Sequence, residues 1–334
     1  MELITLAHGS GGKSSHQLIE GLFYKYFRND ILEQRNDASV LPEILGRIAV
    51  STDSFVIHPV FFPGGDIGKL SVYGTVNDLA MSGAKPLYIT AAFIIEEGFP
   101  LKDLEKIVAS MSEAAKAAEV KIIAGDTKVV EAGSADQIYI NTTGIGILPK
   151  DMNIGGQNAK GGDKILVSGT LGDHGTAIMA LRKGFEFVTD LESDCGLLSG
   201  MIQEILQAGA DIKVLRDPTR GGLAATLNEI SQQSKVGMLL EEGAIPVKQA
   251  VRSLCEILGL DPLYIANEGK LLVIAAEEDA ERVLAVMKNH PLGKDAAMIG
   301  TVMDSPKGQV YLKTEIGGTR ILHMPAGELL PRIC

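Results

Sequence analysis

Hydrophobic and polar positions follow two different periods along the chain. Short apolar runs of strand length are separated by longer segments in which apolar residues recur every three or four positions, as on one face of a helix. In the first 150 residues the two patterns alternate, which predicts a mixed α/β (α+β) domain. The expected strands are 47–51, 87–95, 120–124 and 137–147, and the expected helices are 14–27, 68–81 and 101–119.

The second half of the chain repeats this mixture. Its expected strands are 164–168, 236–240, 271–275 and 297–301, and its expected helices are 176–182, 197–207, 248–258, 278–288 and one following Arg220. A turn-rich stretch after Pro149, containing Gly155-Gly156 and Gly161-Gly162, is the best candidate for a domain boundary. We therefore expect an N-terminal loop and helix (1–45), an N-terminal α/β domain (46–150), a C-terminal α/β domain (151–318) and a flexible tail (319–334).

Composition narrows the class of protein. The 334 residues carry 42 acidic against 31 basic side chains, a net charge of −11, and no basic block offers a footprint for nucleic acid. Neither a signal peptide nor a membrane-spanning run is present in the sequence. The three cysteines, Cys195, Cys255 and Cys334, are far apart and odd in number, which excludes a disulfide framework and indicates a reducing cytoplasm.

A glycine-rich segment, His8-Gly9-Ser10-Gly11-Gly12-Lys13, lies just before the first expected helix. Glycines allow a backbone to close around an oxyanion, a helix N-terminus presents N–H groups, and Lys13 adds positive charge. The spacing is not that of a Walker A loop. A phosphate-binding loop and a plain flexible N-terminal loop both fit these residues.

Three aspartates stand next to small or apolar residues. Asp53 follows a strand, Asp78 lies in an apolar helical run, and Asp126 follows another buried strand in Gly125-Asp126-Thr127-Lys128. An acid in such surroundings costs several kcal/mol unless it is paired or binds a cation. Mg²⁺ accepts a few carboxylates and completes its shell with phosphate oxygens and water. Helix caps and solvated turns are the alternative for each aspartate taken alone, whereas the three together indicate Mg–nucleotide binding.

Several further residues keep two interpretations. Asp66 is either an additional metal ligand or the N-cap of the following helix. The segment 217–223, Asp-Pro-Thr-Arg-Gly-Gly-Leu, fits both an anion site and a well-capped helix. Glu268, in Asn-Glu-Gly-Lys, is a general base if it is partly buried and a turn acid otherwise. His58, His174 and His290 have no metal-ligand spacing and are expected to be structural.

Taken together, these segments resemble one family over essentially the whole chain. They are similar in order to the HypE hydrogenase maturation proteins, carbamoyl dehydratases of the superfamily of aminoimidazole ribonucleotide synthetase and selenophosphate synthetase. The terminal cysteine makes the resemblance specific. The segments that carry it are 8–13, 52–55, 61–70, 74–86, 125–128, 217–223, 267–269 and the ending Pro331-Arg332-Ile333-Cys334.

The resemblance implies a two-domain PurM-like fold whose N-terminal sheets pair in a homodimer. It implies ATP in a cleft beside the dimer interface, covered by the glycine loop, and Mg²⁺ on Asp53, Asp78 and Asp126, with Asp66 as a secondary ligand. The nucleotide-binding residues implied are Gly9, Gly11, Gly12, Lys13, Asp53, Asn77, Asp78, Asp126 and Thr127.

The activity implied by the resemblance is ATP-dependent dehydration of an S-carboxamide on Cys334 to an S-cyanate. The carbamoyl group comes from the carbamoyltransferase HypF, and the cyano group passes to iron on a HypC–HypD complex for nickel–iron hydrogenase. Phosphorylation converts the amide oxygen, a poor leaving group, into a good one. Glu268 is the candidate base for the amide protons, and Lys128 the candidate for stabilising charge on the oxygen or phosphate.

Rival functions remain at this point. A selenophosphate synthetase usually carries cysteine or selenocysteine beside its glycine loop, and His8–Lys13 contains neither. Other ATP-dependent synthetases and kinases of the superfamily require no terminal cysteine. A non-catalytic ATP-binding adaptor, tethered through Cys334, has no need of the acids at 53, 78 and 126.

Overall fold

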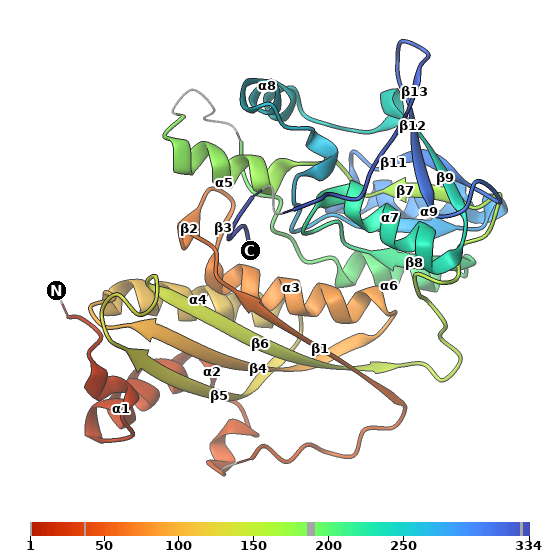
Figure 1. Cartoon of the computed structure of the whole chain (residues 1–334). Helices are drawn as coiled ribbons and strands as arrows, with labels where there is room; N and C mark the ends of the chain where they lie inside the picture. Colours follow the sequence, from red (N-terminus) through yellow and green to blue (C-terminus); the bar gives the residue numbers. More distant parts are fainter. Residues whose placement is uncertain (1, 37, 186–190, 328–329) are drawn as a thin grey trace.

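A four-stranded sheet with helices on one face forms the N-terminal half of the molecule (Figure 1). The computed structural model describes residues 2–36, 38–185, 191–327 and 330–334. A π-helical turn, Ile19–Phe23, joins the first two short helices into one run. The elements are α1 (Lys13–Leu18), α2 (Tyr24–Phe27), β1 (Arg47–Phe55), β2 (Phe61–Phe62), β3 (Gly65–Asp66), α3 (Ile67–Met81), β4 (Lys85–Glu96), α4 (Leu101–Ala117), β5 (Lys121–Val130) and β6 (Ile138–Leu148).

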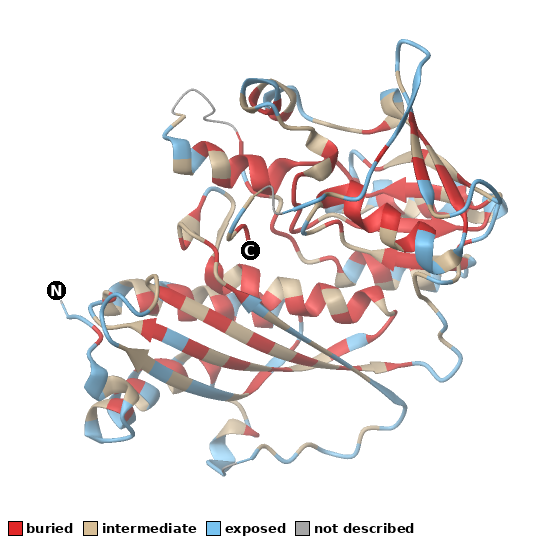
Figure 2. Cartoon of the chain, in the orientation of Figure 1, coloured by how far each residue is buried: buried red, intermediate tan, exposed pale blue. Residues whose placement is uncertain are grey.

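The strand order in this sheet is β1-β6-β4-β5, so β1 and β5 are the two edges. The β4–β5 pair is parallel and the other pairs are antiparallel. Buried and more exposed positions alternate along its strands, because only one face is covered by helices (Figure 2). On the covered face, the Thr142 hydroxyl bonds Thr75 Oγ1 (2.6 Å) and the Ser71 carbonyl (2.9 Å). These bonds fix α3 against the sheet.

The C-terminal half contains a seven-stranded sheet of order β13-β12-β9-β11-β7-β10-β8. Apolar clusters pack on its two faces, and only its β12–β9 pair is parallel. Its elements are β7 (Lys164–Val167), α5 (Asp173–Lys183), α6 (Ser199–Gln207), β8 (Ile212–Arg216), α7 (Gly222–Ser234), β9 (Gly237–Glu241), α8 (Gln249–Leu258), β10 (Leu272–Ala275), α9 (Ala280–Asn289), β11 (Ala297–Met303), β12 (Gln309–Lys313) and β13 (Thr319–Ile321).

The mixed α/β (α+β) architecture agrees with the sequence prediction, but the last part of the chain differs. Thr319–Ile321, expected in the tail, pairs with β12 as β13. Three residues are too few to show a period, so the pattern could not reveal this strand. Residues 328–329 of the expected tail lie outside the described residues. The strands β8 and β12 were also absent from the sequence prediction.

The end of the chain lies between the two halves rather than in solvent (Figure 1). Ile333 and Cys334 are 4% and 9% exposed and belong to the apolar cluster of the N-terminal half. The tail therefore closes one side of the junction between the halves.

Over the described residues, no helix is both long and apolar enough to cross a membrane.

Close packing of α3 on the sheet generates a first prediction. A Cβ atom at Gly144 of β6 would lie 2.7 Å from both Leu79 Cδ1 and Thr75 Cγ2. Gly144→Ala is expected to destabilise the protein by about 1–3 kcal/mol, measured by urea unfolding. The control is Gly21→Ala, because a Cβ at this helical position meets nothing within 4 Å. An unchanged midpoint for Gly144→Ala would contradict the packing argument.

Candidate active site

A small cavity of about 100 Å³ lies where the two halves and the chain end meet. We call it the acid pocket because four carboxylates reach it. Asp53 comes from β1, Asp78 from α3, and Asp217 and Glu268 from loops of the C-terminal half. Its full lining is Thr52, Asp53, Gly74, Asp78, Asp217, Thr219, Arg220, Glu268 and Cys334.

The packing of α3 on β1 brings Asp53 and Asp78 together. Ser51 Oγ donates to Asp78 Oδ2 (2.8 Å), and Asp53 Oδ1 accepts the Ser54 backbone N–H (2.8 Å). Burial, followed by the negative charge of Asp53, raises the pKa of Asp78. Helical and strand segments far apart in the sequence thus place two like charges in one pocket.

The C-terminal half adds two more acids. Burial raises the pKa of Asp217 to about 7, with a further contribution from the charge of Asp78. Burial and the neighbouring Asp194 raise the pKa of Glu268 well above its ordinary value. Glu268 is 5% exposed, and its Oε1 has no hydrogen-bond partner among the described residues. A raised pKa makes such a carboxylate a stronger base than an exposed glutamate, which suits it to accept a proton.

Arg220 is the basic side chain of this pocket. Its pKa is raised first by Cys334 and then, against burial, by the acids Asp53, Glu268 and Asp78. Cys334 lines the same pocket, and its backbone carbonyl accepts the Val56 N–H (3.0 Å). The terminal cysteine, a pair of aspartates, a buried glutamate and an arginine therefore converge at one point.

The carboxylates fit a hard cation that arrives with its own ligands. Among the described residues, no three acidic, histidine or cysteine side chains are spaced to hold a metal ion by themselves. Mg²⁺ is usually bound through one or two carboxylates together with phosphate oxygens and water. Asp53 and Asp78, whose mutual repulsion a cation would relieve, match that donor set.

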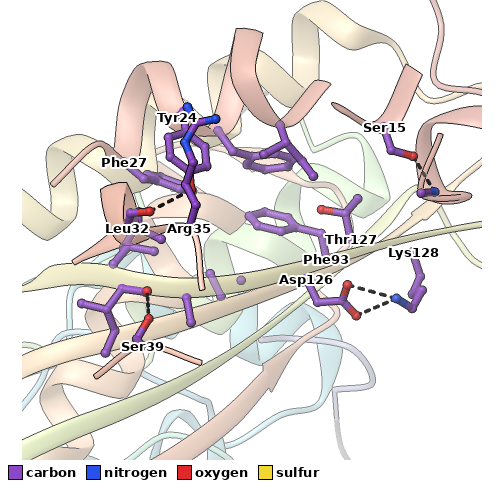
Figure 3. Close-up of a pocket in the computed structure, with 18 of the residues that line it drawn as sticks. Ser15, Tyr24, Phe27, Leu32, Arg35, Ser39, Phe93, Asp126, Thr127 and Lys128 are labelled. Carbon is purple, nitrogen blue, oxygen red and sulfur yellow. Dashed lines mark hydrogen bonds and ion pairs between the residues drawn. The ribbon is translucent and has the colours of Figure 1, made fainter. Parts of the chain in front are cut away.

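The glycine loop lies elsewhere, at one end of a groove of about 570 Å³ between the first helices and β5. We call it the aromatic groove because Phe23, Phe27 and Phe93 line it. Figure 3 shows Tyr24 and Arg35 toward one end, and Ser15, Asp126 and Lys128 toward the other. Gly9, Gly11 and Thr127 also line this groove, while Gly12 and Lys13 are exposed where α1 begins.

The three predicted magnesium ligands are therefore divided between two places. Asp126 lies on β5, where Lys128 Nζ is 2.8 Å from its Oδ2 and lowers the pKa of Asp126. Asp53 lies on the opposite edge strand, and Thr142 and Ala91 stand between it and Gly125 in the register. Three strand spacings separate these edges by about 14 Å. Within one chain the two carboxylates cannot share an ion.

Two further predicted residues have structural roles here. Asp66 caps α3, with Oδ1 accepting the N–H groups of Gly68 (2.7 Å) and Lys69 (3.1 Å), and Ser110 Oγ donates to its Oδ2 (2.6 Å). This is the N-cap alternative, and Asp66 does not line the acid pocket.

Asn77 uses both ends of its buried amide to hold the segment that leads into α6. Its Nδ2 donates to the Gly196 carbonyl (2.9 Å) and its Oδ1 accepts the Leu198 N–H (2.9 Å). In this structure Asn77 therefore joins the two halves, and its contact with a nucleotide stays a prediction.

Two residues that line the acid pocket, Asp217 and Arg220, were not among the site residues predicted from the sequence. The sequence 217–223 indicated either an anion site or a helix cap, and it supplies Asp217 and Arg220 to the pocket. The glycines within it were the available signal, because Gly221 and Gly222 have positive φ angles (75° and 61°) that turn the chain sharply before α7.

The cap geometry gives a prediction that separates the two roles of Asp66. Asp66→Ala should destabilise the protein by about 1–2 kcal/mol, because two N–H groups at the start of α3 lose their acceptor. The affinity for Mg-ATP, measured by calorimetry, should change less than about threefold. Asp66→Asn is the matched control, since its amide oxygen still caps the helix. A large loss of Mg-ATP affinity in both variants would instead identify Asp66 as a ligand.

Comparison with known proteins places this geometry in a family. Residues 35–148 match the N-terminal domain model of AIR synthase related proteins, and residues 160–313 match the corresponding C-terminal domain. The carbamoyl dehydratase HypE of Azotobacter vinelandii is 53% identical over 331 residues, which are 99% of this chain and 97% of that protein.

Solved structures agree with this relationship. A crystal structure of the hydrogenase maturation protein HypE in complex with ATP superposes with a TM-score of 0.95 at 50% identity, covering 99% of both chains. A HypE–HypF complex matches with a TM-score of 0.81 at 54% identity, covering 92% of this chain and 99% of that one. The chain therefore belongs to the HypE family of carbamoyl dehydratases, the hydrogenase maturation proteins with the two-domain fold of AIR synthase related proteins.

Proposed function

We propose that this chain dehydrates an S-carboxamide carried on Cys334 to an S-cyanate, using ATP, and so supplies the cyanide ligand of nickel–iron hydrogenase. The observation that carries the proposal is the position of Cys334 in the acid pocket, beside Asp53, Asp78 and Glu268. Full-length relatives at about 50% identity favour this activity over the rival synthetases and the adaptor.

The reaction balances as one phosphoryl transfer and one elimination. The carboxamide oxygen attacks the γ-phosphorus of ATP, and ADP leaves. The C–O bond then breaks, phosphate departs with the oxygen, and the carbamoyl nitrogen loses its protons to give S–C≡N. Cys334 thus loses the elements of one water molecule, which ATP hydrolysis to ADP and phosphate accounts for.

The side chains of the pocket divide this work. Glu268 is the proposed acceptor of the amide protons, because it is buried, lines the pocket together with Cys334, and its Oε1 has no hydrogen-bond partner among the described residues. Arg220, next to Cys334, is the proposed donor to the oxygen that becomes phosphorylated. Asp53 and Asp78 are the proposed ligands of Mg²⁺, which when bound neutralises phosphate charge.

A homodimer would reunite the divided ligands. The face of the first sheet away from α3 exposes Ile48 (58%), Val50 (65%) and Ile94 (45%). Such an apolar surface favours burial against another copy of the chain. If β1 of one copy meets β5 of the other, Asp126 and Lys128 of the second copy come beside Asp53 of the first. This arrangement removes both free edges.

The same arrangement gives ATP a place. The aromatic groove would take the adenine ring, and the glycine loop, with Gly9 and Gly11, would cover the phosphates at its end. Asp126, Thr127 and Lys128 lie at that end and would direct the γ-phosphate toward the acid pocket of the other copy. Gly12 and Lys13 complete the proposed loop at the start of α1.

The proposed partners follow from the chemistry. The carbamoyltransferase HypF, seen with HypE in a related complex, would load Cys334, and an iron-carrying HypC–HypD complex would accept the cyano group. A reducing cytoplasm would keep the thiol available.

Mass spectrometry tests the activity directly. With carbamoylated protein and Mg-ATP, the C-terminal peptide should lose about 18 Da, one water by the balance above, and Cys334→Ala should abolish this change. ATP affinity of Cys334→Ala should stay within about threefold of wild type, because the glycine loop and the aromatic groove are intact. Loss of the same mass from a peptide containing Cys195 or Cys255 would contradict the proposal.

Mixed dimers test the shared site. Asp53→Asn and Asp126→Asn should each reduce turnover by about 100-fold or more, since each removes a proposed ligand or phosphate contact. Co-refolding equal amounts should restore about a quarter of wild-type activity, because half of the dimers then hold one intact site. Refolding each variant alone is the control. If the mixture stays as inactive as its components, both aspartates act within one chain or the dimer is different.

A further inference from the structure

The last four residues are held mainly through their backbone, and helix α5 provides much of the hold. Arg182 donates three hydrogen bonds from one guanidinium group. Its Nε donates to the His58 carbonyl (2.6 Å), its Nη1 to the Pro331 carbonyl (2.7 Å), and its Nη2 to the Arg332 carbonyl. One side chain therefore binds both the tail and the segment that follows β1.

His174, about two turns before Arg182 on the same side of α5, holds the next carbonyl. Its Nε2 lies 2.7 Å from the Ile333 oxygen, and its Nδ1 lies 2.8 Å from Ser193 Oγ. The Ser193 hydroxyl oxygen also accepts the Cys195 N–H (3.0 Å), so its proton is available to Nδ1. A neutral imidazole with its proton on Nε2 satisfies every one of these bonds. Complete burial lowers the pKa of His174 and favours this neutral form.

The N-terminal half binds the other side of the tail. Arg332 donates from Nε to the Val56 carbonyl (3.0 Å) and from Nη1 to Asp136. The Val56 N–H in turn donates to the Cys334 carbonyl (3.0 Å). Three successive carbonyls, from Arg332 to Cys334, are thus bound by groups that belong to two different halves of the molecule.

We infer that Arg182 and His174 are positioning residues that latch the tail across the two halves and so set the place of Cys334 in the acid pocket. This inference rests on the proposed function for its meaning, but the latch itself is a property of the folded chain. Neither side chain lines the acid pocket, so each acts through the backbone of the tail rather than on the reacting group.

The arrangement also couples release of the tail to loss of part of the contact between the two halves. Arg182 binds the His58 carbonyl of the N-terminal half with the same guanidinium that binds Pro331 and Arg332. Release of the tail therefore removes part of the contact between the halves. An enzyme that loads Cys334 has to break the latch before the thiol can reach its active site, because the docked cysteine is 9% exposed.

The rate of Cys334 alkylation reports how firmly the tail is held and requires no catalytic turnover. Arg182→Met keeps an unbranched, flexible side chain but removes all three donors, so Cys334 should react with iodoacetamide at least ten times faster than in wild type. Asp136→Asn weakens the contact of Arg332 with the N-terminal half at a half-exposed loop position and should also accelerate the reaction. Lys183→Met, an exposed change in the same helix, is the matched control and should leave the rate unchanged.

Cys195, 6% exposed, reports global loosening in the same experiment. Equal alkylation rates at Cys334 in Arg182→Met and wild type would overturn the inference, and so would a parallel acceleration at Cys195.

A second readout is single-turnover dehydration of carbamoylated protein. Arg182→Met and His174→Leu should lower its rate constant at least tenfold with an unchanged KM for ATP, and His174→Gln, which keeps a donor, should recover part of the loss.

If wild-type protein loses no water while alkylation still depends on Arg182, the proposed function fails and the latch stands. If dehydration proceeds while alkylation ignores Arg182, the latch fails and the function stands. The two conclusions are therefore tested separately.

Discussion

Repulsion among clustered carboxylates is the constraint that the structure of the acid pocket has to meet. Asp53, Asp78, Asp217 and Glu268 come from four separate segments and share one small cavity. Burial, with a further contribution from neighbouring acids, raises the pKa values of Asp78, Asp217 and Glu268, so placing these groups together has a cost. That cost is useful only if a cation, a phosphate and a proton acceptor are needed at the same point, which is the requirement of amide activation by ATP.

Contacts in the surrounding fold hold the carboxylates of the acid pocket together despite this cost. Hydroxyl bonds between α3 and the sheet hold Asp78 near Asp53, and the cap at Asp66 fixes where α3 begins. Asn77 ties α3 to the segment before α6 and so joins the two halves. Residues that looked like ligands in the sequence thus stabilise the frame that carries the actual pocket.

The tail completes the acid pocket and is held mainly through its backbone. Its carbonyls are bound by Arg182 and His174, and its side chain Arg332 reaches the N-terminal half. Hydrogen bonds to backbone carbonyls position a chain firmly but are individually modest, so a tail held this way can be exchanged between docked and released positions. The proposed function, in which Cys334 meets both a loading enzyme and ATP, requires that balance.

The sequence by itself determined the alternation of strands and helices, the mixed fold class and the three acids near small residues, because each depends on local period or on a short motif. It also contained the Asp217 and Arg220 segment without revealing its place. Only the tertiary structure decided that Asp66 is a cap, that Asp126 and Asp53 stand on opposite sheet edges, and that Arg182 and His174 hold the tail. The physical reason is that strand register sets the sheet edges, and that the tail contacts join segments more than a hundred residues apart. At Asp66 a cap and a metal ligand have the same local sequence, and only the folded contacts distinguish them.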